Sequence, residues 1–166
     1  METPGLSKLT RKIKAHYPKS TVTLIWNGWG AKNARHLMSQ TSGGLNEVSL
    51  SIDGFHAAAI ADRLEELGRP HSSIDVDRFL LKRITWLLKA GQKKGFQVEF
   101  NGVESDGLEH YVELVEKAHA SLGRKYAREK FFRRARLPGG YATNKTDVYG
   151  DLHIGYDGKL SRKFPG

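Results

Sequence analysis

Four short segments of the chain have the hydrophobic pattern of β-strands. Residues 21–26 are rich in β-branched side chains, residues 47–52 alternate between apolar and polar, and residues 96–100 follow a basic loop bracketed by glycines. Branched and aromatic side chains in short runs between turn residues favour the extended backbone. Residues 151–156, which are followed by an Asp-Gly pair, predict a fourth strand.

Five other segments are predicted to be helices, most of them from apolar residues spaced every three or four positions. Capping side chains, glycines and prolines mark their ends. The order of helices and strands predicts an α+β or mixed α/β fold, with about four strands and four to five helices in one compact domain over 1–166. The order of the strands within the sheet stays open. The predicted helices are 6–16, 31–40, 55–67, a helix from Ser72 or Ser73 to about Ala90, and a long helix from about Gly107, capped by Asp106, to Arg136.

The composition supports a folded chain and excludes several kinds of site. Of the 166 residues, 39% are hydrophobic and 10% are aromatic, which is enough to bury a core in one domain. The absence of cysteine excludes disulfides, thiol nucleophiles and cysteine-based zinc sites, and it fits a reducing compartment. No apolar stretch is long enough to span a bilayer or to serve as a signal peptide, so we expect a cytoplasmic protein without a membrane partner.

Charge is unevenly distributed, and this is the strongest indication of function in the sequence. The net charge is +9, and residues 1–46 and 117–166 carry +6 and +8 around a middle section, residues 47–116, that carries −5. The basic ends include an N-terminal arm over about 1–19 and a C-terminal tail over about 157–166. A polyanion is the partner that best explains two basic ends, and nucleic acid is the commonest polyanion.

The basic residues gather in two clusters that would contact phosphates. The segment 124–136 holds seven basic residues, one acid and three aromatics, an arrangement that on a helix suits phosphate contacts and base stacking. The same pattern is also typical of a solvated helix end, where the helix dipole favours cations. The predicted phosphate contacts are Lys8, Arg11, Lys12 and Lys14 in the first cluster, and Arg124, Lys125, Arg128, Lys130, Arg133, Arg134 and Arg136 in the second.

A glycine-rich junction, Asn27-Gly28-Trp29-Gly30, follows the first predicted strand and precedes a predicted helix. Free backbone N–H groups at such a junction can hold a phosphate, and an exposed Trp29 would stack on a base. The junction has neither the Walker lysine with its Ser/Thr nor a GxGxxG spacing, so a plain turn beside a core tryptophan is the simpler explanation. Trp29 is therefore a candidate nucleic-acid contact on the condition that it is exposed.

One histidine could turn a binding surface into a ribonuclease. His153 lies on a predicted strand with Tyr156 and Lys159 close by. These three side chains would supply the base, the acid and the cation that metal-independent phosphodiester cleavage needs. A half-buried strand histidine is the simpler explanation of His153.

Carboxylates suggest a second, metal-dependent route to a nuclease. Asp53 ends a predicted strand, Glu99 lies in another, and Asp75 and Asp77 are two apart at a helix start. Two or three of these carboxylates, if they converge, would hold Mg²⁺ and activate water, and Mg²⁺ is a cofactor under this alternative alone. The three aspartates also fit an ordinary turn and a first helical turn. Glu99 lacks the lysine two residues on that the PD-(D/E)xK pattern needs, and the seven histidines form no HxH or HExxH motif, so no metal site is predicted from a motif.

The sequence thus favours a protein that binds nucleic acid through its basic ends. Affinity would come from phosphate contacts, and sequence specificity would be modest. A small nuclease or ribonuclease that uses the same surface is the first alternative. An assembly protein that docks its basic ends on an acidic partner, or on its own acidic middle section, is the second. The sequence does not separate RNA from DNA.

Overall fold

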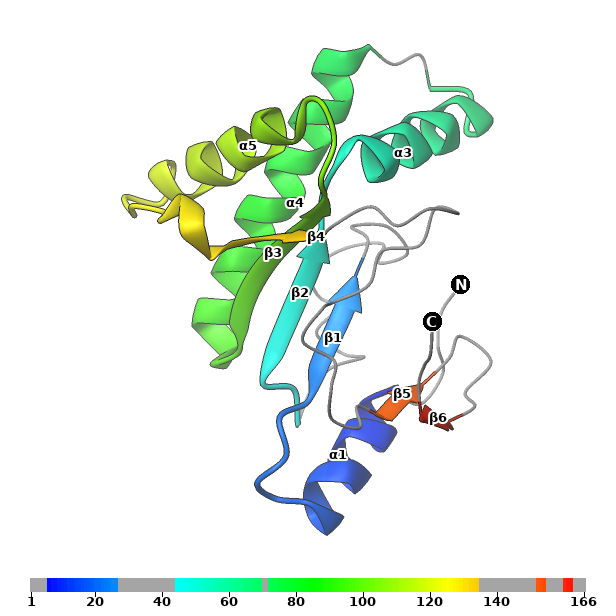
Figure 1. Ribbon diagram of the computed structural model, residues 1–166, viewed down its shortest axis with the longest axis vertical. Helices are drawn as coiled ribbons and strands as arrows, with labels where there is room; N and C mark the ends of the chain where they lie inside the picture. The colour runs from blue at the N-terminus through cyan, green and yellow to red at the C-terminus, as the bar shows by residue number, and fades with distance from the viewer. Residues whose placement is uncertain (1–5, 27–43, 70–71, 135–151, 155–159, 163–166) are drawn as a thin grey trace.

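A four-stranded parallel sheet forms the centre of the molecule (Figure 1). The computed structural model describes residues 6–26, 44–69, 72–134, 152–154 and 160–162 of the chain. All three neighbouring strand pairs are parallel, so the carboxyl ends of the strands lie at one end of the sheet. The strands are β1 (Thr23–Trp26), β2 (Glu47–Ser51), β3 (Gln97–Val103) and β4 (Phe131–Arg134), in the order β1-β2-β3-β4.

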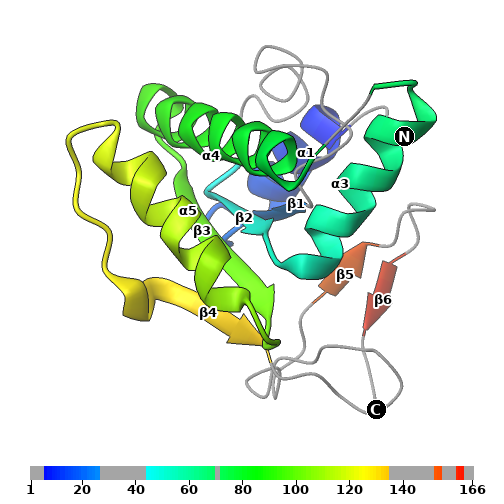
Figure 2. The same cartoon turned by 90° about the horizontal axis from the view of Figure 1, so that it is seen from above.

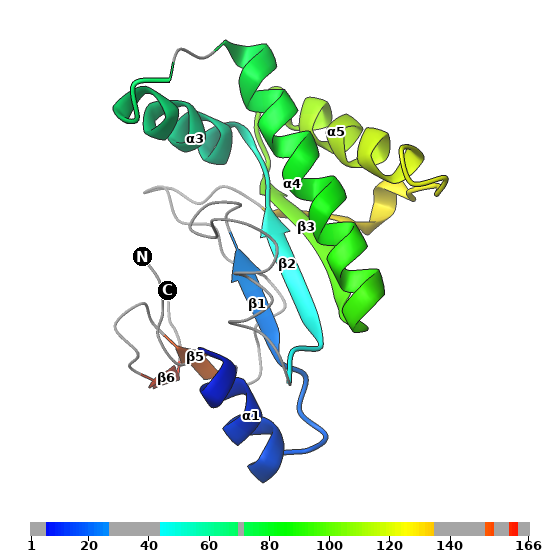
Figure 3. The ribbon, with the colours of Figure 1, turned by 180° about the vertical axis from the view of Figure 1, so that it is seen from behind.

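Helices lie on one face of this sheet and at both ends of its strands. α4 (Ser73–Lys94) and α5 (Leu108–Ala120) pack together across one face, while α3 (Gly54–Glu66) lies beyond the carboxyl ends and α1 (Leu6–His16) lies at the amino ends (Figures 1, 2 and 3). When right-handed crossovers connect parallel strands and all move along the sheet in the same direction, their helices lie on the same face of the sheet. Four α-helices and a parallel sheet among the described residues confirm the predicted mixed α/β class.

The hydrophobic core lies between the sheet and the helices α4 and α5. Leu50 of β2 stands opposite Phe100 of β3, and Phe100 stands opposite Phe131 of β4. All three side chains are buried, as are Ile84 of α4 and Val112 of α5. Side chains along a strand point alternately to the two faces of the sheet. The side chains at the intervening positions of these strands therefore lie on the second face.

The second face of the sheet carries a buried polar group at its centre. Asn101 of β3 donates a hydrogen bond from Nδ2 to Ser49 Oγ at 2.7 Å, and it accepts one at Oδ1 from Ser51 Oγ at 3.0 Å. All three side chains are buried. Buried polar groups that satisfy one another cost little, whereas removing one leaves its partners unpaired. Asn101 therefore ties β2 to β3 on the face opposite the helices.

Helix α4 runs one turn further than the sequence predicts. Its N-cap is Ser72, one of the two serines predicted for this role, and Ser72 forms a reciprocal capping box with Asp75. The predicted end near Ala90 is wrong, because Gly91 continues the helix and Gly95, at φ +77°, ends it. A Cβ at Gly91 would lie 2.9 Å from the Phe96 carbonyl oxygen, so this glycine allows the helix to approach the chain that follows it.

The long helix predicted from Gly107 to Arg136 is wrong, because the helix ends at Ala120. A loop with Gly123 at φ +68° follows, then a 3₁₀ turn η1 (Arg128–Lys130) and strand β4. Phe131 is buried opposite Phe100. Pairing with a strand distant in sequence thus outweighs the local helix propensity of this basic segment.

A second, two-stranded antiparallel sheet is formed by β5 (Leu152–Ile154) and β6 (Leu160–Arg162). β5 confirms the centre of the strand predicted over 151–156, whereas β6 lies in a tail that was expected to be an exposed extension. The predicted helix over 31–40 lies outside the described residues. Within the part of the chain that the structure describes, no helix has both the length and the apolar character needed to cross a membrane.

Candidate functional site

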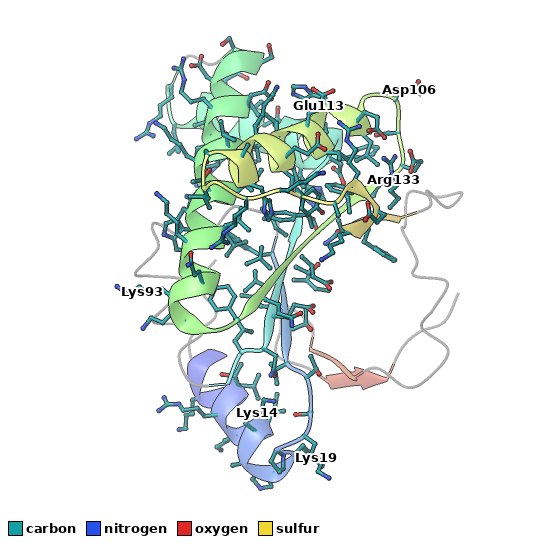
Figure 4. The ribbon with its side chains drawn as sticks, turned by 90° about the vertical axis from the view of Figure 1, so that its left-hand side faces the viewer. Lys14, Lys19, Lys93, Asp106, Glu113 and Arg133 are labelled. Atoms are coloured by element: carbon teal, nitrogen blue, oxygen red, sulfur yellow. The ribbon has the colours of Figure 1, made fainter. Side chains whose placement is uncertain are left out.

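The first predicted basic cluster and the end of the second, at Arg133, lie at different ends of the sheet. Lys14 and Lys19 lie at the end that carries α1, near the amino ends of the strands, whereas Arg133 lies toward the carboxyl ends with Asp106 and Glu113 (Figure 4). The structure therefore does not join residues 8–19 and the end of the second cluster into one continuous basic surface.

Two arginines of the second cluster are bound to acids of α5 and of the loop before it. Arg128 makes a bidentate pair with Glu116, with N–O distances of 2.8 and 2.7 Å, and lies 3.2 Å from Glu109. Arg133 pairs with Glu109 and Glu104. The hydrogen bond to Glu116 raises the pKa of Arg128, and the one to Glu109 raises the pKa of Arg133. These two guanidinium groups are largely neutralised by the acidic middle section of their own chain.

The other residues of the second cluster have mixed positions. Arg124 donates a hydrogen bond to Gln92 of α4, and Lys125 and Lys130 are exposed and form no ion pair with any described residue. For Arg134 the structure describes only the backbone, which lies in β4 opposite Val103 of β3. Four candidates predicted from the sequence lie outside the described residues: Trp29, Arg136, Tyr156 and Lys159.

Helix α1 carries the first cluster on an exposed surface. Lys8, Arg11 and Lys12 are exposed, while Lys14 is partly buried and donates a hydrogen bond to the carbonyl of Ser20. The sequence contains no acidic residue between positions 6 and 22. Three cations at positions i, i+3 and i+4 share one face of a helix.

The other side of α1 is fixed to the start of the chain segment that leads into β2. Thr10 is buried, and a Cβ at Gly44 would lie 2.9 Å from the Thr10 carbonyl oxygen. The helix and this segment therefore approach closely only because position 44 has no side chain. This contact sets which face of α1 is exposed.

The last turns of α4 add cations near the amino ends of the strands. Lys89, Lys93 and Lys94 are exposed and form no ion pair with a described residue. The helix dipole favours cations at this end. Gln92 of the same turns accepts the hydrogen bond from Arg124, so the 124–130 segment lies against this end of α4. Sequence reasoning did not include these lysines, because they fall in the section with net negative charge.

A second set of titratable side chains lies at the carboxyl end of β2. Asp53 is fully buried and caps α3, accepting hydrogen bonds from the His56 N–H at 3.0 Å and the Val103 N–H at 3.0 Å. It also pairs with His56 Nδ1 at 2.7 Å. Burial alone would raise the pKa of Asp53, but the hydrogen bonds from His56 and Val103 outweigh burial and hold it below its ordinary value. An ionised Asp53 therefore fixes the orientation of the His56 ring.

The remaining predicted carboxylates do not converge on Asp53. Asp75 accepts from Ser72 in the capping box of α4, Asp77 lies 2.9 Å from His110 Nε2, and Glu99 lies in the amino half of β3. Among the described residues, no three histidine or acidic side chains are grouped so that they could hold a metal ion. Tyr111, next to His110, has a pKa raised by burial and by the charges of two aspartates.

A pocket of about 740 Å³ lies where β3, the end of α4 and the 124–130 segment meet. His119 and Tyr126 line it, with ring centroids 4.8 Å apart, and Phe100 packs edge-on against Tyr126 at 5.9 Å. Burial, then the charge of Arg124, lowers the pKa of His119. Burial, then the charge of Glu99, raises the pKa of Tyr126. His119 is thus held neutral beside a neutral tyrosine.

Sequence reasoning missed this pocket for a simple reason. Tyr126 was interpreted as one aromatic of a basic helix, and His119 as one of seven histidines without a motif. Their contact depends on a chain reversal after α5 that places Tyr126 back against His119. The described part of the C-terminal hairpin places His153 by its backbone alone, opposite Ser161.

Comparison of the chain with known protein families, with curated proteins and with solved structures finds no match.

Proposed function

We propose that the protein binds nucleic acid, and that the cations at the amino end of the sheet make the phosphate contacts. One observation carries the proposal. Lys8, Lys12 and Lys19 form no ion pair with a described residue, whereas Arg128 and Arg133 are paired with glutamates. Unpaired cations are free to replace the counterions of a phosphate backbone, and paired ones must first give up a partner.

The arrangement of α1 supports contact along a backbone. The helix has 11 residues and is therefore about 16 Å long. Lys8, Arg11 and Lys12 lie on its exposed side, and Lys93 and Lys94 of α4 add charge at the same end of the sheet. Such contacts position a protein on a polyanion without reading its sequence, so we expect modest specificity. A nucleic-acid partner and a cytoplasmic location both belong to this proposal.

The salt dependence of binding tests the proposal. Affinity for an RNA or DNA duplex is measured at several salt concentrations with the wild type and with the variant Lys8→Ala, Lys12→Ala, Lys19→Ala. If all three cations meet phosphates, the slope of log K against log[salt] flattens by about 2–3 for duplex DNA. The matched control is Lys117→Ala, which removes an exposed lysine paired with Glu113 on α5. A slope unchanged in the triple variant, or no binding even at low salt, overturns the proposal.

A second candidate function, cleavage of nucleic acid without a metal, is favoured by the Asp53–His56 pair. A buried carboxylate that holds Nδ1 of a histidine leaves Nε2 available as a general base, as in hydrolase triads. In RNA, His56 would take the proton of the 2′-hydroxyl as its oxygen forms a bond to phosphorus. The bond from phosphorus to the 5′-oxygen breaks, and the leaving 5′-oxygen takes a proton from water. Cleavage that survives EDTA, and that His56→Gln abolishes while binding persists, supports this candidate. Intact RNA after long incubation, or activity lost in His153→Ala alone, counts against it.

A further inference from the structure

We infer that the pocket between β3, α4 and the 124–130 segment binds one nucleotide, with its base against Tyr126 and the open edge of β3 and its phosphate on the cations that line the pocket. The inference deepens the proposed function and rests on it for the source of the nucleotide. A volume of about 740 Å³ falls within the usual range for small-molecule sites.

Unsatisfied polar atoms are the first observation. Both ring nitrogens of His119 and the hydroxyl of Tyr126 are buried, and none has a hydrogen-bond partner among the described residues. Buried polar groups are paired in the great majority of cases, and each unpaired one costs roughly 1–3 kcal/mol. Three such atoms lie on two touching rings that line one pocket, and a bound molecule would have to part these rings to supply the missing partners.

The edge of β3 is the second observation. β4 begins opposite Phe100, so no described strand lies beside Gln97, Val98 and Glu99 on that side. The Gln97 N–H donates to the Asn46 carbonyl, on the side of β2. Because neighbouring residues of a strand direct their backbone groups to opposite sides, the N–H and C=O of Val98 face the pocket. A donor and an acceptor side by side match the edge of an adenine base, which presents one acceptor nitrogen next to one amino group.

The cations that line the pocket are the third observation. Arg124, Lys125 and Lys130 all line the pocket, and the two lysines form no ion pair with a described residue. A phosphate accepts hydrogen bonds from several such donors at once. The aromatic ring of Tyr126 adds a stacking surface, which contributes about 1–3 kcal/mol per base in single-strand binding proteins. Together, these three features fit a ligand in which an anionic group is joined to a flat ring with hydrogen-bonding edges.

Calorimetric titration tests the inference with AMP, adenosine and inorganic phosphate as probes. We expect AMP to bind at least about tenfold more tightly than either adenosine or phosphate, because each of these lacks one half of the contacts. Lys125→Ala with Lys130→Ala should weaken AMP about tenfold and leave adenosine nearly unchanged. Tyr126→Phe, which keeps the ring and removes the hydroxyl, should weaken both by about fivefold. Lys117→Ala is the matched control on α5 and should bind AMP as the wild type does.

His119→Leu separates a binding role from a structural one. If the two ring nitrogens of His119 serve to bind a ligand, the leucine variant keeps or raises the melting temperature of the free protein. Its affinity for AMP falls at least about fivefold. If His119 serves only the fold, the variant loses stability and binds AMP normally once folded, and that result overturns the inference. Failure of AMP to bind the folded wild type at millimolar concentration overturns it as well.

Two further measurements identify the source of the nucleotide and distinguish a failure of this inference from a failure of the proposed function. A short oligoadenylate that displaces AMP better with a 5′-phosphate than without one indicates the end of a strand, and equal or no displacement indicates a free nucleotide. Loss of AMP binding alone, with the salt-dependent binding through α1 intact, refutes the pocket and leaves the proposed function standing. Loss of both refutes the two together.

Discussion

Replacing Asp53 with alanine removes the side chain that joins the end of β2, the start of α3 and the end of β3. The carboxylate accepts from the His56 N–H and from the Val103 N–H, each at 3.0 Å, and pairs with His56 Nδ1 at 2.7 Å. Loss of the helix cap alone costs about 0.5–2 kcal/mol. The Val103 N–H, left without its acceptor, costs about 1–3 kcal/mol more. We therefore expect a total loss of roughly 2–4 kcal/mol.

The pH dependence of stability gives an independent measure of the same group. Because the folded protein holds the pKa of Asp53 below its ordinary value, the unfolded chain takes up a proton first as the pH falls. The stabilisation is therefore fully present above about pH 5, and it declines as the pH falls through the ordinary carboxyl pKa near 4 toward the folded value. Asp53→Asn, which cannot ionise, should lose this part of the acid dependence.

Urea unfolding and thermal melting check the prediction. For a chain of this size, 2–4 kcal/mol corresponds to a fall in melting temperature of roughly 5–15 °C. Asp62→Ala is the matched control, because it removes an exposed acid from the same helix. A change within about 0.5 kcal/mol for Asp53→Ala would mean that the three hydrogen bonds contribute nothing net, and the account of this junction would be refuted.

Three other outcomes follow from the described contacts. Asn101→Ala should lower stability by about 2 kcal/mol in urea unfolding, because its two serine partners lose a buried hydrogen bond. Gly102→Ala should lower it by about 1–3 kcal/mol, since a Cβ there would lie 2.6 Å from the Ile52 carbonyl oxygen; equal stability would show that the strands can separate. His119 should titrate by NMR below the ordinary histidine value, and Arg124→Ala should raise its pKa, whereas no change would exclude the charge as a cause. Since the folded form of His119 resists protonation, its contribution to stability should decline as the pH falls through about 6.5.

Local patterns in the sequence were enough to predict α1, α3 and the start of α4. Each has apolar residues at helical spacing, and Ser72 is one of the two serines predicted to cap α4. Strands β1, β2 and β3 were also predicted, because β-branched and aromatic residues gather between turn residues. These features depend on neighbours within a few residues.

The segment after α5 could not be predicted from local patterns. Its arginines, lysines and alanine favour a helix, but burial of Phe131 against Phe100 requires a strand. The net charge of the segment also did not reveal that Arg128 and Arg133 would find glutamates on α5. Charge along a sequence gives the number of cations, and the fold decides which of them stay unpaired.

The candidate pocket could not be predicted from local sequence patterns either. His119 and Tyr126 are seven positions apart, and a continuous helix would have kept their rings about two turns from each other. The reversal at Gly123 places one ring against the other, and the amino half of β3 has no described strand beside it on the side where β4 lies. An unpaired strand edge is a property of the whole sheet, so no single residue indicates it.

The parallel pairing of β2 with β3 also sets how this protein must fold. Leu50 and Phe100 stand opposite each other although fifty positions separate them along the chain. Closing so long a loop costs entropy before any strand contact forms, and proteins rich in such distant pairs fold more slowly than helical bundles of similar stability. We therefore expect the barrier to folding to lie at the meeting of these two strands. Shortening the Leu50 or Phe100 side chain should slow refolding, whereas changes in α1, which lies at the amino ends of the strands, should act mainly by speeding unfolding.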